Sequence, residues 1–348
     1  MIKVLIIDDS AMVRKVLSQN LSKERDIEVV GTAPEPYSGR DKILKLKPDV
    51  LILDIEMPKM DGLTFLEKLM SSYPMPVIIY SSVAEKRSEN AMRALELGAV
   101  DVISKPGGSY STDIMLNQLI DKIKAAHKYK FSISKKINDK SKQNSKVIRE
   151  SMIRTTDKII AIGASTGGTQ ALRFLIGQLP SNMPPIIITQ HMPQTFTKSF
   201  ANSLNERSKL EVVEAQDGEL LRTGKVLIAP GNYHMILKRD GARYYVQIKD
   251  GPPVYHQRPS VEVMFYSVAK YAGKNAIGII LTGMGKDGAE GLLEMRNSGA
   301  YTIAQSEKSC VVFGMPREAI RIEAADKILD LEEMPDYLVR VLKKDRLK

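Results

Sequence analysis

Short runs of β-branched residues alternate with helical patterns along most of this 348-residue chain. The segments between the runs, such as MVRKVLSQNLSK, carry apolar residues at three- and four-residue spacing, which is typical of amphipathic helices. In residues 1–125 the predicted strands are Val4–Asp8, Glu28–Thr32, Val50–Asp54, Val77–Ser81 and Val102–Lys105. Strands and helices in this alternation build a parallel sheet covered by helices on both faces. The pattern therefore predicts an α/β domain with five parallel strands, which binds ligands at their carboxyl ends.

The same alternation begins again at Ile159. The predicted strands here are Ile159–Ala164, Ile186–Thr189, Val226–Ala229, Ala276–Leu281 and Tyr301–Ala304. Between Tyr233 and Val254, two segments of alternating polarity flank Asp240-Gly241, which is a hairpin signal. We expect a second doubly wound, mostly parallel sheet that carries an antiparallel hairpin insert.

Positive charge is concentrated between the two patterns. Residues 128–158 contain ten Lys or Arg and three acids, so they carry +7 of the chain's net charge of +10. The segment is rich in Lys, Ser and Asn and lacks periodicity, which is typical of a solvated linker. Weak steering towards an acidic partner or a membrane surface is the alternative interpretation. We expect domains at residues 1–125 and 158–345, joined by a basic linker at 126–157.

Neither a membrane span nor a secretion signal is visible in the sequence. No apolar run approaches the ~20 residues that span a bilayer. The first apolar run, VLII, is cut off by Asp8 and Asp9, unlike a signal peptide. Cys310 is the only cysteine, which excludes an intrachain disulfide and fits a reducing compartment. We expect a cytoplasmic protein without membrane insertion.

Charged and polar residues close the predicted strands of the first domain. Asp8 and Asp9 end the first strand, Asp54 the third, Ser81 the fourth and Lys105 the fifth. Three carboxylates on one rim repel each other, and an all-oxygen site with room for water suits Mg²⁺. Each acid alone is equally well explained as a helix cap or turn former. Together the set predicts a carboxylate that attacks a phosphoryl group.

Three polar residues follow strands of the second domain: Ser165, His191 and Asp287. A serine needs a base to remove its proton, and the base needs a carboxylate to fix its tautomer. Side chains from three strand ends of one sheet can meet in one crevice, which favours a serine hydrolase. The alternatives are that Ser165 and Asp287 are helix caps and that His191 is a buried turn residue.

The glycine-rich loop GASTGG at residues 163–168 suits phosphate binding as well as a nucleophile. It lacks the lysine of a P-loop, does not match G-x-G-x-x-G, and does not match the G-x-S-x-G of ordinary α/β-hydrolases. From the residues alone, a serine hydrolase is only somewhat preferred over a nucleotide-binding fold. His234 and His256 lack companions at metal-ligand spacing and receive no role.

The first domain resembles the receiver domain of two-component response regulators, a flavodoxin-like fold, in VLIIDDSAMVR, ILDIEMPKMDGL and VDVISKP. The resemblance implies that Asp54 is the phosphorylated aspartate. It also implies that Asp8, Asp9, Asp54 and the backbone carbonyl of Glu56 surround the metal ion.

In the same family resemblance, Ser81 and Lys105 contact the phosphoryl oxygens, with Ser82 as a one-residue alternative to Ser81. Val102 stands where many receivers carry an aromatic switch residue. Switching by rotation of an aromatic side chain at this position is therefore in doubt for this chain, although phosphorylation is not.

Six further motifs, in this order, resemble the chemotaxis protein-glutamate methylesterase/glutaminase (CheB) family. They are IGASTGGTQAL, ITQHMP, IAPGNYHMIL, RPSVEVMF, ILTGMGKDGAEGL and VVFGMPREAI. The resemblance implies that Ser165 is the nucleophile, His191 the base and Asp287 the orienting acid. Backbone N–H groups of Thr166 and Met284 are the candidate oxyanion donors.

The resemblance further implies a phosphorylation-activated hydrolase for sensory adaptation. Its reactions release methanol from glutamate methyl esters and ammonia from glutamines on cytoplasmic parts of chemoreceptors, without a cofactor in the ester reaction. A histidine kinase is the implied phosphodonor, and the unphosphorylated receiver is expected to block the esterase crevice. The rival classes are a DNA-binding and a nucleotide-binding response regulator. No helix-turn-helix is recognisable and the positive charge lies mainly in the linker, so no nucleic-acid partner is expected.

Overall fold

The structure is a computed structural model of the chain. It describes residues 1–57, 60–81, 85–105, 112–129 and 158–344. The chain divides into two compact units, Met1–Tyr129 and Lys130–Lys348, the second of which is described from Lys158. Ser82 and residues 130–157 of the expected linker lie outside the described residues.

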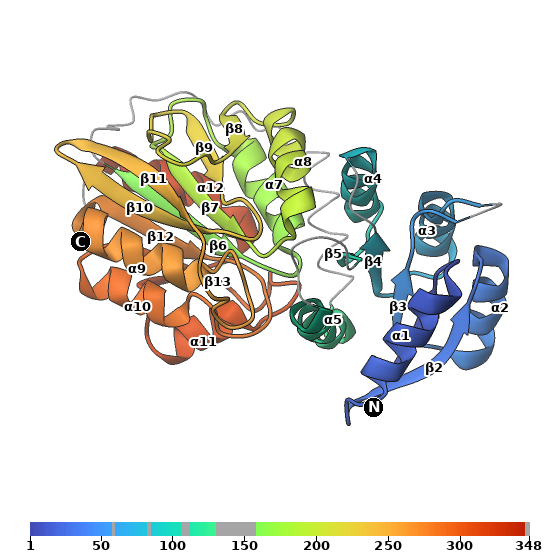
Figure 1. Cartoon of the computed structure of the whole chain (residues 1–348). Coiled ribbons are helices and arrows are strands. Elements are labelled where there is room, and N and C mark those ends of the chain that lie inside the picture. The colour runs from blue at the N-terminus through green and yellow to red at the C-terminus, as the bar shows by residue number, and fades with distance from the viewer. Residues whose placement is uncertain (58–59, 82–84, 106–111, 130–157, 345–348) are drawn as a thin grey trace. The chain divides into compact units, whose positions relative to one another are not determined.

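The N-terminal unit is a parallel five-stranded sheet with helices on both faces (Figure 1). Its elements are β1 (Ile2–Ile7), α1 (Ala11–Leu21), β2 (Ile27–Ala33), α2 (Pro36–Leu46), β3 (Val50–Leu53), α3 (Gly62–Ser72), β4 (Val77–Ser81), α4 (Glu85–Glu96), β5 (Asp101–Ser104) and α5 (Thr112–His127). Every residue of β3 and β4 is buried, as expected for strands covered on both sides. The predicted five-stranded α/β domain is confirmed.

The strand order β2-β1-β3-β4-β5 places the reversal of the chain between β1 and β3. The chain runs from β1 to β2 on one side and then returns to β3 on the other, and all neighbouring pairs are parallel. A crevice opens at the carboxyl ends of the two strands where the order reverses. Asp8 and Asp54, which directly follow these strands, are therefore neighbours across this point.

The C-terminal unit contains a seven-stranded sheet in the order β14-β13-β12-β6-β7-β9-β8. Its strands are β6 (Ile159–Ala164), β7 (Ile186–Gln190), β8 (Glu211–Glu214), β9 (Lys225–Ile228), β12 (Ala276–Ile280), β13 (Tyr301–Gln305) and β14 (Lys327–Leu329). All neighbouring pairs are parallel. The sequence did not indicate β8 and β14, because these edge strands are only four and three residues long.

The expected hairpin is present as a separate two-stranded antiparallel sheet, formed by β10 (His234–Asp240) and β11 (Arg243–Lys249). The helices of the unit are α7 (Gly168–Gln178), α8 (Gln194–Asn205), α9 (Val261–Ala272), α10 (Ala289–Asn297), α11 (Met315–Arg321) and α12 (Met334–Lys344). The predicted mostly parallel sheet with an antiparallel hairpin is thereby confirmed.

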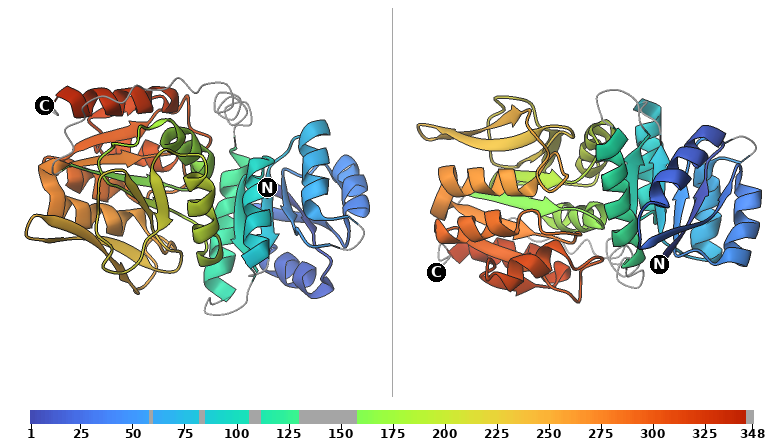
Figure 2. Two further views of the ribbon diagram at one scale, coloured as in Figure 1. Left: turned by 90° about the horizontal axis from the view of Figure 1, so that it is seen from above. Right: turned by 60° about the horizontal axis from the view of Figure 1, so that its bottom comes forward.

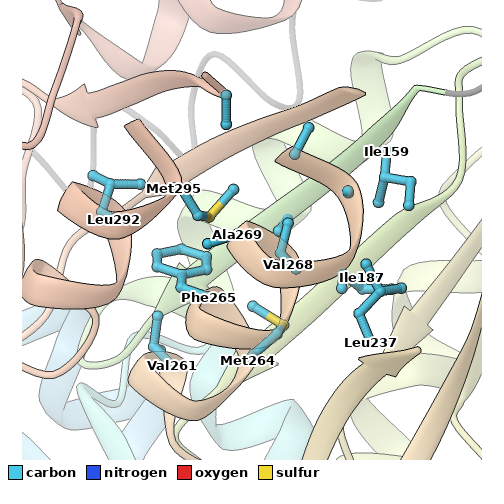
Figure 3. Packing of buried hydrophobic residues seen from close by; sticks show 14 of the residues in the cluster. Ile159, Ile187, Leu237, Val261, Met264, Phe265, Val268, Ala269, Leu292 and Met295 are labelled. Atoms are coloured by element: carbon cyan, nitrogen blue, oxygen red, sulfur yellow. The ribbon is translucent and has the colours of Figure 1, made fainter. Parts of the chain in front are cut away.

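Helix α9 lies at the centre of the apolar core of this unit (Figure 3). Val261, Met264, Phe265 and Val268 are fully buried. They lie among side chains of α10, of the sheet and of the hairpin, including Met295 of α10 (Figure 3). A helix that is apolar on most of its faces belongs in a core, and this packing fixes where α9 begins.

Helix α12 (Met334–Lys344) has one buried face. In α12, Leu338, Val339 and Leu342 are buried, and the helix contacts α7 (Figure 2). The described part of α5 is 16 residues long and ends with Lys124 and His127 in its last turn. Across the described ranges, no helix combines the length and the apolar character that a bilayer crossing requires.

Candidate functional sites

An acidic cluster occupies the reversal point of the N-terminal sheet. Carboxylate oxygens of Asp8, Asp9 and Asp54 lie within 4.8 Å of one another. The ammonium of Lys105, from the end of β5, lies 2.8 Å from Asp8 Oδ2 and 2.6 Å from Asp54 Oδ2. The structure thus brings together four of the residues that the sequence placed on this rim.

Burial controls the electrostatics of this cluster. It raises the pKa of Asp54, and the hydrogen bond and charge of Lys105 offset this effect only partly. For Lys105, burial opposes the charged form, but hydrogen bonds to Asp54 and Asp8 outweigh it and raise the pKa of the ammonium. Three carboxylates beside one ammonium leave excess negative charge, which a divalent cation can compensate.

The arrangement fits Mg²⁺, since carboxylate oxygens within this spacing suit a small cation that retains some of its water. Glu56 belongs to the same loop as Asp54 and donates its backbone N–H to Asp54 Oδ1 at 3.3 Å. Ser81 is 1% exposed at the end of β4, and among the described residues its hydroxyl has no hydrogen-bond partner. A buried hydroxyl without a partner is unusual and is explained if a ligand completes the site.

The second site lies at the carboxyl ends of β6 and β7. Ala164 and Gln190 are paired across these parallel strands, so Ser165 and His191 follow at the same level. The backbone N–H of His191 donates to Ala164 O at 3.1 Å, and that of Ser165 donates to Thr282 O at 3.0 Å. The strand order puts β12, which precedes Thr282, on the other side of β6. Ser165 therefore stands where the strand order reverses, between β6 and β12, and His191 lies beside it at the end of β7.

Asp287 reaches this rim from the loop before α10. Its Oδ2 lies 2.7 Å from His191 Nε2. The carboxylate also accepts hydrogen bonds from the Ser260 hydroxyl at 2.7 Å and from the backbone N–H groups of Val261 and Glu262 at 2.8 and 3.0 Å. These two amides begin α9, where the helix dipole favours negative charge. Asp287 is thus held rigidly with one oxygen on the imidazole.

The hydrogen bond to Asp287 decides which nitrogen of His191 is available for catalysis. Because the carboxylate accepts from Nε2–H, the proton of neutral His191 resides on Nε2. Nδ1 then carries the lone pair that can accept the proton of a neighbouring serine.

The helix-cap interpretations of these residues are not supported. The N-cap of α7 is Gly167 and that of α10 is Gly288, and neither N-cap residue makes a side-chain cap hydrogen bond. Asp287 does bind helix amides, but they belong to α9 and not to its own helix. Ser165 and Asp287 thus have no local capping task at the helices that follow them.

The glycines of this rim allow close packing. Gly167 has φ +78°, and a Cβ there would lie 2.7 Å from Val311 Cβ. At Gly168 a Cβ would lie 2.1 Å from Gln190 Oε1. A side chain at either of these two glycines would therefore collide with protein atoms. At Gly283 a Cβ would lie 2.4 Å from Met315 Sδ and 2.7 Å from the Cβ of Ser165 itself.

The two candidate oxyanion donors lie close to Ser165, one next to it in the sequence and the other after Gly283, which packs against it. Thr166 is the next residue and its carbonyl accepts from Thr282 Oγ1 at 3.1 Å. Met284 follows Gly283, and within the described ranges its backbone N–H has no acceptor. Oxyanion stabilisation requires a backbone N–H group of this kind, which has no acceptor and lies beside the serine.

Sequence reasoning missed the residues that hold the site together. Gln190 donates to the carbonyls of Ser165 and His191 at 3.0 and 3.3 Å, and Ser260 donates to Asp287. His234, which had received no role, accepts the backbone N–H of Ser260 at 3.3 Å. The signal that could have found Ser260 is its place as the N-cap before a long apolar helix.

Comparison with known proteins places both sites within recognised domains. The family model for CheB methylesterase matches residues 160–338, and that for the response regulator receiver domain matches residues 4–114. These ranges contain, respectively, the site around Ser165 and the acidic cluster around Asp54.

Relatives match along nearly the whole length. The protein-glutamate methylesterase/protein-glutamine glutaminase 2 of Syntrophus aciditrophicus is 56% identical, over 98% of this chain and 99% of that protein. The corresponding protein of Bdellovibrio bacteriovorus is 49% identical, over 98% of this chain and 97% of its own. The crystal structure of the Thermotoga maritima CheB methylesterase catalytic domain, 39% identical, covers 53% of this chain and 98% of its own with a TM-score of 0.52.

Proposed function

Because this chain belongs to the CheB methylesterase family, we propose that it is a phosphorylation-activated protein-glutamate methylesterase and protein-glutamine glutaminase acting on chemoreceptors. The observation that carries the proposal is the buried His191–Asp287 pair, with Ser165 at the same level on the neighbouring strand. In such an arrangement a serine hydroxyl can act as a nucleophile on a side-chain ester or amide.

In the proposed reaction, Ser165 Oγ attacks the carbonyl carbon of a glutamate methyl ester while its proton passes to His191 Nδ1. The amides of Thr166 and Met284 stabilise the oxyanion that forms. His191 then returns the proton to the departing methoxide, which leaves as methanol, and Ser165 holds the glutamyl group as an ester. Water hydrolyses this ester by the same proton route. A glutamine substrate follows the same steps with ammonia as the leaving group.

The receiver site supplies the control in this proposal. Asp54 takes a phosphoryl group from a histidine kinase, and Ser81 and Lys105 bind its oxygens. Asp8, Asp9, Asp54 and the backbone carbonyl of Glu56 would hold Mg²⁺, which compensates the charge of carboxylates and phosphoryl group when bound. The phosphorylated state then favours an arrangement in which the esterase crevice is open.

The phospho-acceptor assignment predicts a selective loss of stimulation in Asp54→Asn. Methanol release from methylated receptor membranes by the unaltered chain is expected to rise several-fold with Mg²⁺ and a small phosphodonor. Asp54→Asn should retain the basal rate and show no rise, because an amide cannot attack phosphorus. The exposed Asp41, replaced by Asn, is the matched control and should respond normally. A normal response of Asp54→Asn would remove this residue as the acceptor.

The blocking role of the receiver predicts that its removal activates the enzyme. A chain lacking residues 1–150 should release methanol several-fold faster than the unphosphorylated full chain, since nothing then competes with the substrate for the crevice. It should also be indifferent to the phosphodonor. A rate at or below that of the full chain would contradict blocking and leave the esterase assignment intact.

A further inference from the structure

Two buried acids bind the starts of each other's helices beside the esterase site. Asp287, which precedes α10, accepts the first backbone N–H groups of α9. Glu262, in the first turn of α9, accepts the backbone N–H of Gly288 through Oε2 at 2.7 Å. Gly288 is the N-cap of α10 and directly follows Asp287. The first amides of a helix have no partner within it, and each helix here obtains one from the other.

The two helix starts meet almost backbone to backbone. Gly288 has φ +89°, and a Cβ there would lie 2.4 Å from Val261 Cγ1. At Gly291 a Cβ would lie 2.8 Å from Phe265 Cβ. Val261 and Phe265 are the α9 side chains that face α10 (Figure 3). Because the two helix starts are in close contact, a displacement of Glu262 would also displace Asp287.

Glu262 brings a titratable carboxyl into the buried contact between the two helix starts. Glu262 is 5% exposed, and its carboxyl interacts with the backbone N–H groups of Gly288 and Gly291 at the start of α10. Burial, with the nearby charge of Asp287 as a further contribution, raises the pKa of Glu262 to about 7. The other titratable groups that face it are Glu290 of α10, Tyr266 of α9 and Tyr255 of the preceding loop. The carboxyl therefore changes charge near neutral pH.

We propose that Glu262 is a positioning residue of the esterase, which fixes Asp287 through the Gly288 amide and whose negative charge supports the imidazolium that forms on His191 during the reaction. The proposal rests on the proposed function of Ser165, His191 and Asp287. An ionised Glu262 places a second negative charge behind Asp287 and so favours the imidazolium that forms when Ser165 loses its proton. The neutral carboxyl retains the hydrogen bond and loses this effect.

The test compares Glu262→Ala and Glu262→Gln in the full chain, with Glu290→Gln as the control for an exposed acid at the same helix start. Glu262→Ala should lower kcat for methanol release about tenfold or more with little change in KM, because Asp287 loses its support. Glu262→Gln should restore most of kcat, since its carbonyl still accepts the Gly288 N–H. Glu290→Gln should have the same kcat and KM for methanol release as the unaltered chain.

The pH profile of kcat/KM separates the charge from the packing. In Glu262→Gln, the acid limb of this profile should move to lower pH, because a nearby negative charge is lost. An unchanged pH profile in Glu262→Gln, or full kcat in Glu262→Ala, would overturn the proposal. Methanol release that persists in Ser165→Ala would instead overturn the proposed function.

Discussion

Replacing Ser165 by alanine is expected to lower methanol release from methylated receptor membranes by a factor of at least about 10³. The variant keeps the backbone of the rim, since its N–H still donates to Thr282 and its carbonyl still accepts from Gln190. Only the hydroxyl that would form the covalent ester is lost. Any residual rate should come from the oxyanion donors and from substrate binding alone.

Ser181→Ala is the matched control for this experiment, because this exposed serine lies before β7, at the amino end of the strand. It should release methanol at the normal rate. Thermal melting of both variants should match that of the unaltered chain and so exclude unfolding as the cause. Full release by Ser165→Ala would remove the nucleophile and return the glycine loop to the phosphate-binding interpretation.

Asp287→Asn should lower kcat by about 10³-fold to 10⁴-fold, close in size to the loss of the serine. An asparagine can turn its NH₂ group towards His191 Nε2, which then becomes the acceptor. The ring proton of neutral His191 would move to Nδ1, the nitrogen that must take the proton of Ser165. The base would be present but in the wrong tautomer.

The measurement is kcat over a range of pH, together with the NMR signals of the His191 ring nitrogens in both variants. Asp240→Asn, an exposed acid at the hairpin turn, is the control and should leave kcat unchanged. If Asp287→Asn kept a normal kcat, the carboxylate would serve only to hold the start of α9, and another group would have to orient His191.

The sequence predicted the fold well where strands are buried on both faces. Runs such as VLIL and IIAIGA contain only residues that suit a covered parallel strand, so their positions could be identified directly. β14, with the sequence KIL, carries no comparable signal. Such an edge strand forms because a neighbouring strand is already in place, and this information is not local.

The site was predictable to the extent that it depends on strand ends. Ser165 and His191 follow adjacent strands, and the parallel register brings them to one level without further information. The environment of Asp287 was not predictable in this way. Its partners Ser260, Val261 and Glu262 depend on how closely α9 and α10 approach each other, which only the packed core determines. The motif RPSVEVMF was visible in the sequence, but the capping of one helix by a residue of another was not.

The pairing of β6 with β12 has a consequence for how the enzyme acquires activity. It aligns Ile159 with Ala276, so the two central strands of the sheet are separated by most of the C-terminal unit along the chain. Closing so long a loop is entropically costly, and contacts between distant residues form slowly. A growing polypeptide that already contains Ser165 and His191 has no Asp287 beside them until β12 has been synthesised and inserted. Any hydrolysis that depends on Asp287 therefore begins only after β12 and the loop that follows it have taken their places in the sheet.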